Sequence, residues 1–113
     1  MAIRARLPYP PTVNHYWKIG QGRIYVSRNG VVYRKRVLAI LGDAPEQPGR
    51  LSVAVGVHPP DRRKRDLDNV LKCLLDAITK AGVWKDDSVI DRLLVERRNV
   101  KTGGMVEVVI DAI

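Results

Sequence analysis

The stretch DRRKRDLDNVLK, residues 61–72, sets carboxylates directly beside a run of cations. Asp66 and Asp68 lie two positions apart, where a helix is expected to begin. A single aspartate at that place has a structural use, because it caps free backbone N–H groups and favours the helix dipole. Two close carboxylates repel each other unless a cation lies between them. A hard divalent ion such as Mg²⁺ accepts one or two carboxylates and keeps water ligands for a phosphate.

The helix that follows repeats polar residues at a spacing of four. Asp68, Lys72 and Asp76 therefore lie on one helix face. This spacing alone favours a solvated face with ion pairs between successive turns. The functional interpretation instead makes Lys72 a cation that faces a phosphate next to a metal.

A second acidic group follows in the segment WKDDSVID, residues 84–91. Adjacent aspartates often mark a turn, and Asp86 or Asp87 could cap a short helix there. A third carboxylate that returned to Asp66 and Asp68 would instead complete a metal site. The helix between the two acidic groups is about four turns long, so the chain must fold back for Asp87 to approach Asp68.

Four consecutive cations, Arg62, Arg63, Lys64 and Arg65, lead into the first acidic pair. Arginine holds phosphate through paired hydrogen bonds, so this loop could draw a nucleic-acid backbone towards the carboxylates. The whole chain has 20 Lys and Arg against 12 Asp and Glu, a net charge of +8, which favours a polyanionic partner. Cations that bind and carboxylates that hold a metal are what a metal-dependent nuclease requires.

The chain length and composition predict one small globular domain in 113 residues. The single cysteine, Cys73, excludes an intramolecular disulfide and lies in an apolar helical run, where a small core residue is expected. The N-terminal segment has no apolar signal core and no run reaches the length of a membrane span. We therefore expect a cytoplasmic protein with no membrane partner.

Hydrophobic periodicity predicts the elements that would position these residues. Short strands are expected in AIRARL and RIYV, a helix in SRNGVVYRKRVLAILG, and a strand in RLSVAVGV. Ser27 could cap that first helix, although Asn29-Gly30 could form a turn instead. A second helix runs from Asp66 to a stop at Gly82, and a closing β-hairpin around Thr102-Gly103-Gly104 ends the chain. The pattern indicates an α+β fold: about five strands in a mixed or mostly antiparallel sheet, with two main helices packed on it.

The motifs together resemble the RusA family of Holliday junction resolvases. The likeness is carried by DRRKRDLDN, by the leucine-rich helix with Lys72, by a Trp-x-Asp-Asp group and by LPYPPTVNHYW near the start. It extends from about Leu7 to Asp91. It implies a single nuclease domain over residues 1–113, a homodimer, and Mg²⁺- or Mn²⁺-dependent cleavage of four-way DNA junctions without an organic cofactor. Members are commonly bacterial or carried by phages.

The resemblance also implies roles for individual residues. Asp66, Asp68 and Asp87 match the essential carboxylates that hold the metal, and Lys72 matches the catalytic lysine. Asp76 and Asp86 match acidic positions for which a structural role is expected, and Lys85 departs from the apolar residue usual before the two aspartates. Seven residues are expected to contact DNA: Arg62, Arg63, Lys64, Arg65, Asn69, Lys18 and Arg23.

Two further expectations concern assembly and the aromatic residues. Resolution of a junction needs two symmetric nicks, so one acidic cluster in each chain requires a two-fold dimer. The final strands and exposed apolar residues such as Trp84 are candidates for the dimer interface, and Trp84 is also a candidate for the core. Tyr9, Tyr16 and Trp17 could stack on bases, although packing under a neighbouring element is more usual. His15 and His58 are expected to be satisfied polar groups or DNA contacts, because Mg²⁺ prefers oxygen.

Two other functions explain part of the sequence. A non-catalytic nucleic-acid-binding module accounts for the positive charge but not for the aspartates clustered within it. A metal-dependent nuclease that acts on forks or flaps shares the acids and the metal. The sequence therefore favours a junction-resolving nuclease and keeps these two as alternatives.

Overall fold

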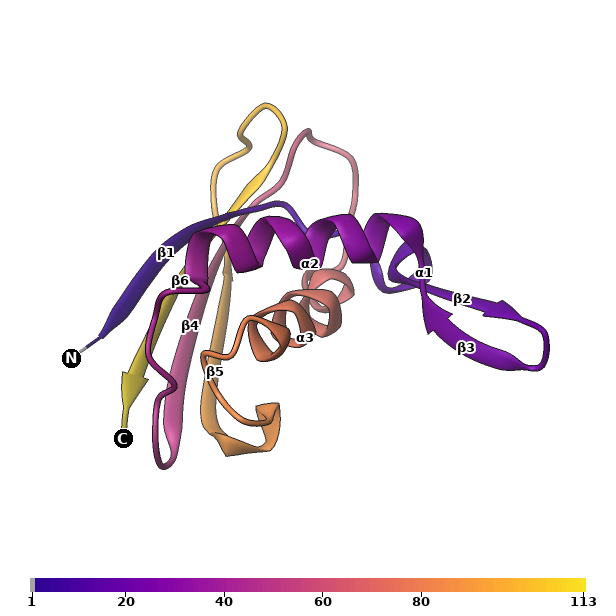
Figure 1. Ribbon diagram of the computed structural model, residues 1–113. Coiled ribbons are helices and arrows are strands. Elements are labelled where there is room, and N and C mark those ends of the chain that lie inside the picture. The colour runs from indigo at the N-terminus through magenta and orange to yellow at the C-terminus, as the bar shows by residue number, and fades with distance from the viewer. Residues whose placement is uncertain (1) are drawn as a thin grey trace.

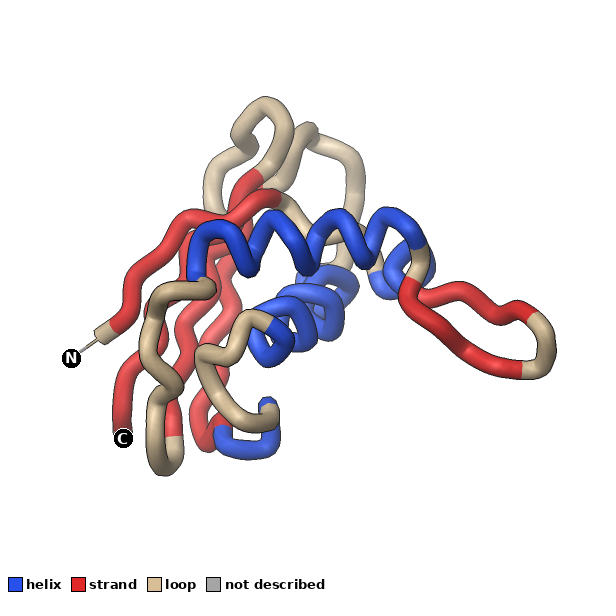
Figure 2. Tube along the Cα trace, viewed as in Figure 1, coloured by secondary structure: helices blue, strands red, loops and turns tan. Residues whose placement is uncertain are grey.

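The computed structural model describes residues 2–113; Met1, the first residue of the single domain expected over residues 1–113, lies outside them. The chain forms a mixed sheet, a separate two-stranded hairpin and two main helices, as Figures 1 and 2 show. The elements follow in the order β1 (Ile3–Pro8), α1 (Val13–Tyr16), β2 (Trp17–Gly20), β3 (Arg23–Val26), α2 (Arg28–Leu41), β4 (Leu51–His58), the 3₁₀ turn η1 (Leu67–Val70), α3 (Leu71–Lys80), the 3₁₀ turn η2 (Asp87–Val89), β5 (Ile90–Arg97) and β6 (Met105–Ala112). The predicted α+β class is confirmed.

The main sheet has four strands in the order β1-β6-β4-β5. β6 pairs antiparallel with both β1 and β4, while β5 pairs parallel with β4. Parallel neighbours need a long crossover connection, which is usually helical. Here η1, α3 and η2 make up that crossover, so both acidic groups of the sequence belong to one connection between two paired strands.

The closing β-hairpin predicted from the sequence is wrong. The turn at Gly103 and Gly104 exists, and both glycines have positive φ angles, but it carries the chain across β4 instead of back along β5. The reason is visible in the burial of the two strands. β6 alternates the buried residues Val106, Val108 and Ile110, which suits a central strand, whereas β5 is rich in exposed charge, which suits an edge.

Helices α2 and α3 cover one face of this sheet and bury the core against it (Figure 1). Val53, Val55 and Val57 point from β4 into this layer, and Leu74 and Ile78 meet them from α3. All five side chains are almost completely buried. Trp84 is also a core residue, 1% exposed, with its indole N–H donating to the Thr79 hydroxyl at 2.6 Å. It is therefore not available as exposed material for a dimer interface.

The start of the first main helix, α2, agrees with the first of the two alternatives given by the sequence, a cap at Ser27. Ser27 is the N-cap of α2 and its hydroxyl accepts from the Gly30 N–H at 3.1 Å, so Asn29-Gly30 does not form an independent turn. Gly30 lies against α1 and β3. A β-carbon added there would be 2.5 Å from Val26 Cγ1 and 2.9 Å from the Tyr16 carbonyl oxygen. The absence of a side chain thus lets α2 pack directly on α1.

The sequence pattern missed α1 and β2, which precede the predicted strand β3. β2 and β3 form a hairpin that extends away from the sheet and helices (Figure 1). Its two-residue turn is Gln21-Gly22, with φ angles of 52° and 77°. Positive φ at both central residues is the geometry of the turn that best fits a twisted hairpin. A Gln-Gly pair between two short apolar runs was therefore the available signal.

We predict that Gly30→Ala lowers the free energy of unfolding by about 1–3 kcal/mol, because its β-carbon must displace Val26 or the Tyr16 backbone. Val31→Ala, in the same turn of α2 but exposed, should change the value by less than about 0.5 kcal/mol. Chemical denaturation measures both. Equal stability of the two variants would contradict the close packing of α2 on α1.

Candidate active site

Asp66 and Asp68 lie at the start of the crossover. Asp66 comes just before the 3₁₀ turn η1, and Asp68 lies within it. Asp66 has an extended backbone and makes no capping hydrogen bond with its side chain. Both residues are exposed, and no ion pair to either is found within residues 2–113. The capping role that the sequence allowed for one of them is therefore absent, and both carboxylates face solvent.

The third aspartate of this segment, Asp61, folds the basic loop. Its Oδ1 accepts from the Arg63 backbone N–H at 2.9 Å and from Arg65 Nη1 at 2.6 Å. The hydrogen bond from Arg65, followed by that from the Arg63 backbone, lowers the pKa of Asp61 to about 2. Arg65 also supplies its carbonyl oxygen to Arg97. Arg65 is thus a positioning residue in this loop. Arg62, Arg63 and Lys64 are exposed, where a polyanion could contact them.

Asp87 lies at the other end of the crossover, where η2 packs against α3. Asp86 is the N-cap of η2 and accepts from the Ser88 N–H at 3.0 Å, so the capping role falls to Asp86. Burial raises the pKa of Asp87, and the neighbouring Asp86 and Asp76 raise it further, whereas Lys72 lowers it. Asp87 thus lies in the electrostatic field of the polar face of α3. A carboxylate crowded by carboxylates is a position that a bound cation would relieve.

Asp76, in the middle of that face, is tied to the protein interior. It accepts from Arg34 Nη2 at 2.7 Å and Nε at 3.0 Å, and from the hydroxyl of Tyr16. The Tyr16 side chain is fully buried, and burial together with the hydrogen bond to Asp76 raises its pKa. This network joins α1, α2 and α3. It matches the structural role expected for Asp76.

Lys72 is left free by this arrangement. The ion pairs expected from the spacing of Asp68, Lys72 and Asp76 do not form, because Asp76 pairs with Arg34 on another helix. Within the described residues Lys72 has no salt bridge, is exposed, and acts on Asp87 through its charge. Asp91, the remaining aspartate of the second acidic group, forms an ion pair with Arg50, whose Nε donates to Asp91 Oδ1 at 2.8 Å.

The donors suit a hard divalent ion by their chemistry, since Asp66, Asp68 and Asp87 offer carboxylate oxygens that no arginine or lysine neutralises through an ion pair in residues 2–113. They are not drawn into a tight set: in that same part of the chain, no three His, Cys, Asp or Glu side chains lie close enough together to hold a metal.

The other expected DNA contacts are distributed over two regions. Asn69 is half-buried in η1, beside Asp68. Lys18 and Arg23 are exposed on the β2–β3 hairpin, well away from the basic loop in Figure 1. The two histidines have local partners. His58 contacts the Asn99 carbonyl oxygen at 2.9 Å and Glu107 Oε1 at 2.7 Å, and His15 Nδ1 lies 3.2 Å from the Thr12 hydroxyl.

Arg34 was missed by the sequence reasoning, and Tyr16 was expected only as a packing residue. Their partner Asp76 lies 42 positions beyond Arg34 and 60 beyond Tyr16, so no local spacing connects them. Arg34 follows Tyr33 and precedes Lys35 and Arg36 in the predicted helix, so the local sequence contains no signal for this pairing. None of the helices within residues 2–113 is long and apolar enough to cross a membrane.

Comparison with known proteins identifies relatives of this chain. Residues 8–111 match the family described as Endodeoxyribonuclease RusA. The chain is 40% identical over 107 residues to "Crossover junction endodeoxyribonuclease RusA" of Escherichia coli (strain K12), covering 92% of this chain and 89% of that protein. The protein of the same name from Shigella sonnei (strain Ss046) is 39% identical, and that of Enterobacteria phage 82 is 38% identical, with the same coverage.

We predict that Arg34→Gln lowers the free energy of unfolding by about 1.5–3 kcal/mol, because the Asp76 side chain, only 22% exposed, loses two charged hydrogen bonds. Arg50→Gln breaks the Arg50–Asp91 pair, which is exposed and screened by water, and should lower the free energy of unfolding much less. Denaturant titration compares them. A loss for Arg34→Gln no larger than that for Arg50→Gln would contradict the structural role of the Asp76 network.

Proposed function

The chain belongs to the RusA family of endodeoxyribonucleases, and from that premise we propose that it resolves four-way DNA junctions by paired, symmetric nicks. The observation that carries this proposal is the division among its aspartates. Between residues 61 and 91, Asp61, Asp76 and Asp91 are each paired with an arginine and Asp86 caps η2, whereas Asp66, Asp68 and Asp87 have neither an ion pair nor a capping role within residues 2–113. These three are the family-matched carboxylates. Their availability in a strongly cationic chain supports a role in metal binding.

In this proposal Asp66, Asp68 and Asp87 hold Mg²⁺, for which Mn²⁺ can substitute. When bound, such an ion would act as a Lewis acid on the scissile phosphate and would make a water molecule bound to it more acidic. Lys72 places a positive charge on the same face of α3 and meets the phosphate directly. Arg62, Arg63 and Lys64 bind the DNA backbone leading to the site, with Asn69 beside Asp68. Arg65 keeps this loop in shape through Asp61.

The active form is a homodimer. Two strands of a junction are cut symmetrically, and one chain carries one set of family-matched carboxylates, so two chains related by a two-fold axis supply the pair of sites. The partner is four-way junction DNA, and the place of action is the cytoplasm of a bacterial host or of a phage-infected cell. Fork or flap cleavage is the alternative activity, since it needs the same acids and metal.

We predict that Asp68→Asn abolishes junction cleavage in Mg²⁺, with a rate loss on the order of a thousandfold or more, while junction binding is retained. The change removes one negative charge but no cation of the binding loop. Asp91→Asn is the matched control and should cut normally, because Asp91 pairs with Arg50. Gel-based cleavage and binding with a synthetic four-way junction measure both properties.

The same assay, repeated with a fork, a flap and a linear duplex, tests the substrate. Selective nicking of the junction that needs Mg²⁺ or Mn²⁺ is expected. Equal cleavage of all substrates would overturn the junction assignment, and cleavage of none would overturn the nuclease. Normal cutting by Asp68→Asn would remove that residue from the site.

A further inference from the structure

The β2–β3 hairpin is the most exposed apolar feature of the described chain. Ile19 is 81% exposed and Ile24 67%, whereas the exposed apolar residues of α2 and β5 lie between 41% and 53%. The hairpin extends beyond the helices as an arm (Figures 1 and 2). A lone two-stranded hairpin is only marginally stable in water. Such an arm therefore gains stability when another surface covers it.

The strand register gives this arm two different faces. Trp17 pairs with Val26 and Ile19 with Ile24, which places all four apolar side chains on one face. Lys18 pairs with Tyr25, and Gly20 with Arg23, which places both cations on the other face. Both charged residues of this eight-residue ribbon thus lie on one face together with Tyr25, and the opposite face is apolar.

The apolar face continues onto the short helix at the base of the arm. Ile19, Ile24 and Trp17 line a shallow hollow together with Val13 and Asn14 of α1. Trp17 is held there by an edge-on contact with the buried Tyr16 ring, with ring centroids 5.0 Å apart. The hollow is therefore anchored to the body of the protein through Tyr16, the residue that also binds Asp76.

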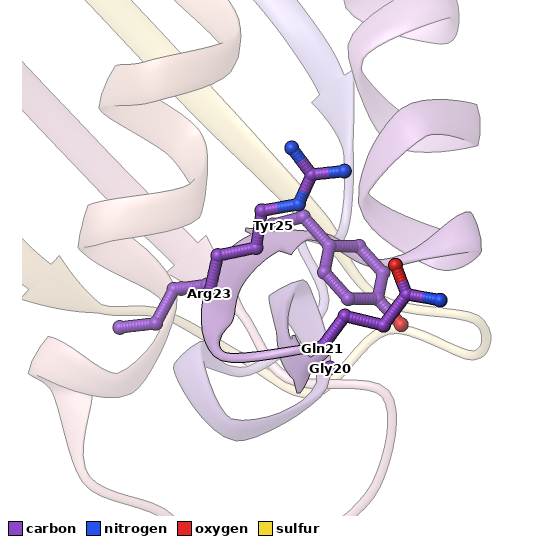
Figure 3. A pocket seen from close by; sticks show the side chains of 5 residues that line it. Gly20, Gln21, Arg23 and Tyr25 are labelled. Carbon is purple, nitrogen blue, oxygen red and sulfur yellow. The ribbon is translucent and has the colours of Figure 1, made fainter.

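The cationic face has a different character. Figure 3 shows Arg23 and Tyr25 extending around a second hollow at the tip, next to Gly20 and Gln21. The Tyr25 ring lies directly over Gly20, where an added β-carbon would be 3.0 Å from its Cε1 atom. A cation beside an aromatic ring suits a nucleic-acid backbone and its bases. This face accounts for DNA contact, and the apolar face does not, because it offers no charge to a polyanion.

We propose that the arm holds the dimer together: its apolar face, Trp17, Ile19, Ile24 and Val26, packs on a second copy of this chain, and its cationic face remains free for DNA. The occupant follows from the proposed function, on which this inference rests, because symmetric nicking requires a second copy and hence a self-association surface. A specific interface buries about 800 Å² on each partner, so the α1 hollow joins the arm in the contact.

The test uses two double variants of the same hairpin. Ile19→Thr with Ile24→Thr removes apolar surface but keeps β-branched residues that favour strands. Lys18→Thr with Arg23→Thr makes the same change on the opposite face. Sedimentation over a range of concentrations should show the dimer of the isoleucine variant weakened about 100-fold or more, since two exposed apolar side chains lose their cover. The cationic variant should stay dimeric and bind junction DNA with a smaller salt dependence.

A photoreactive benzophenone side chain in place of Ile24 gives a second measurement that does not depend on loss of the dimer. Illumination should yield a covalent dimer, and the same group in place of Leu38, exposed on α2, should not. An isoleucine variant that remains dimeric, or equal dissociation of both hairpin variants, would overturn the proposal. A wild-type monomer that still cuts junctions would overturn the arm and the dimer but leave the nuclease assignment standing.

Discussion

The proposed metal site imposes one constraint on the structure: a carboxylate that is to bind a metal must not form an ion pair with a cation of its own protein. With a net charge of +8 and four cations immediately before Asp66, neutralisation by a nearby arginine is the obvious hazard. Three arginines of the chain have other carboxylate partners, and Arg62 and Lys64 form no ion pair with any carboxylate in residues 2–113. Arg65 is taken by Asp61, Arg34 by Asp76 and Arg50 by Asp91. Asp66, Asp68 and Asp87 have no ion pair within residues 2–113, as the proposed metal site requires.

The β4–α3–β5 crossover is the element that serves this constraint. One connection carries both acidic groups, because parallel strands oblige the chain to return along the sheet through a helix. Asp66 and Asp68 precede α3 and Asp87 follows it, and the charge of Lys72 in the first turn of α3 acts on Asp87. The Asp76 network then fixes α3 against α1 and α2. The same Tyr16 that completes this network supports the base of the hairpin, so the arm and the acidic face share one anchor.

The local sequence patterns predicted the helices and strands that are determined by interactions between residues close together in the sequence. Helical spacing located α3, alternation located β1 and β4, and Ser27 was one of two alternatives for the start of α2. The β5–β6 hairpin was wrong because strand neighbours are chosen by burial across the whole sheet, and a turn at Gly103 and Gly104 is compatible with either topology. The pairing of Asp76 with Arg34 could not be predicted, since it joins helices far apart in sequence. The roles of Asp66, Asp68, Lys72 and Asp87 came from a family resemblance, as their spacing alone also fits a solvated face.

The central claim, that Asp66, Asp68 and Asp87 share a hard divalent ion, is tested most directly by Mn²⁺ binding followed by electron paramagnetic resonance. The account predicts that the wild-type chain binds Mn²⁺ and that Asp68→Asn and Asp87→Asn each weaken binding by at least about tenfold, because one oxygen ligand is lost from either end of α3. Asp91→Asn should bind as the wild type does. Unchanged Mn²⁺ affinity in both Asp68→Asn and Asp87→Asn would contradict it.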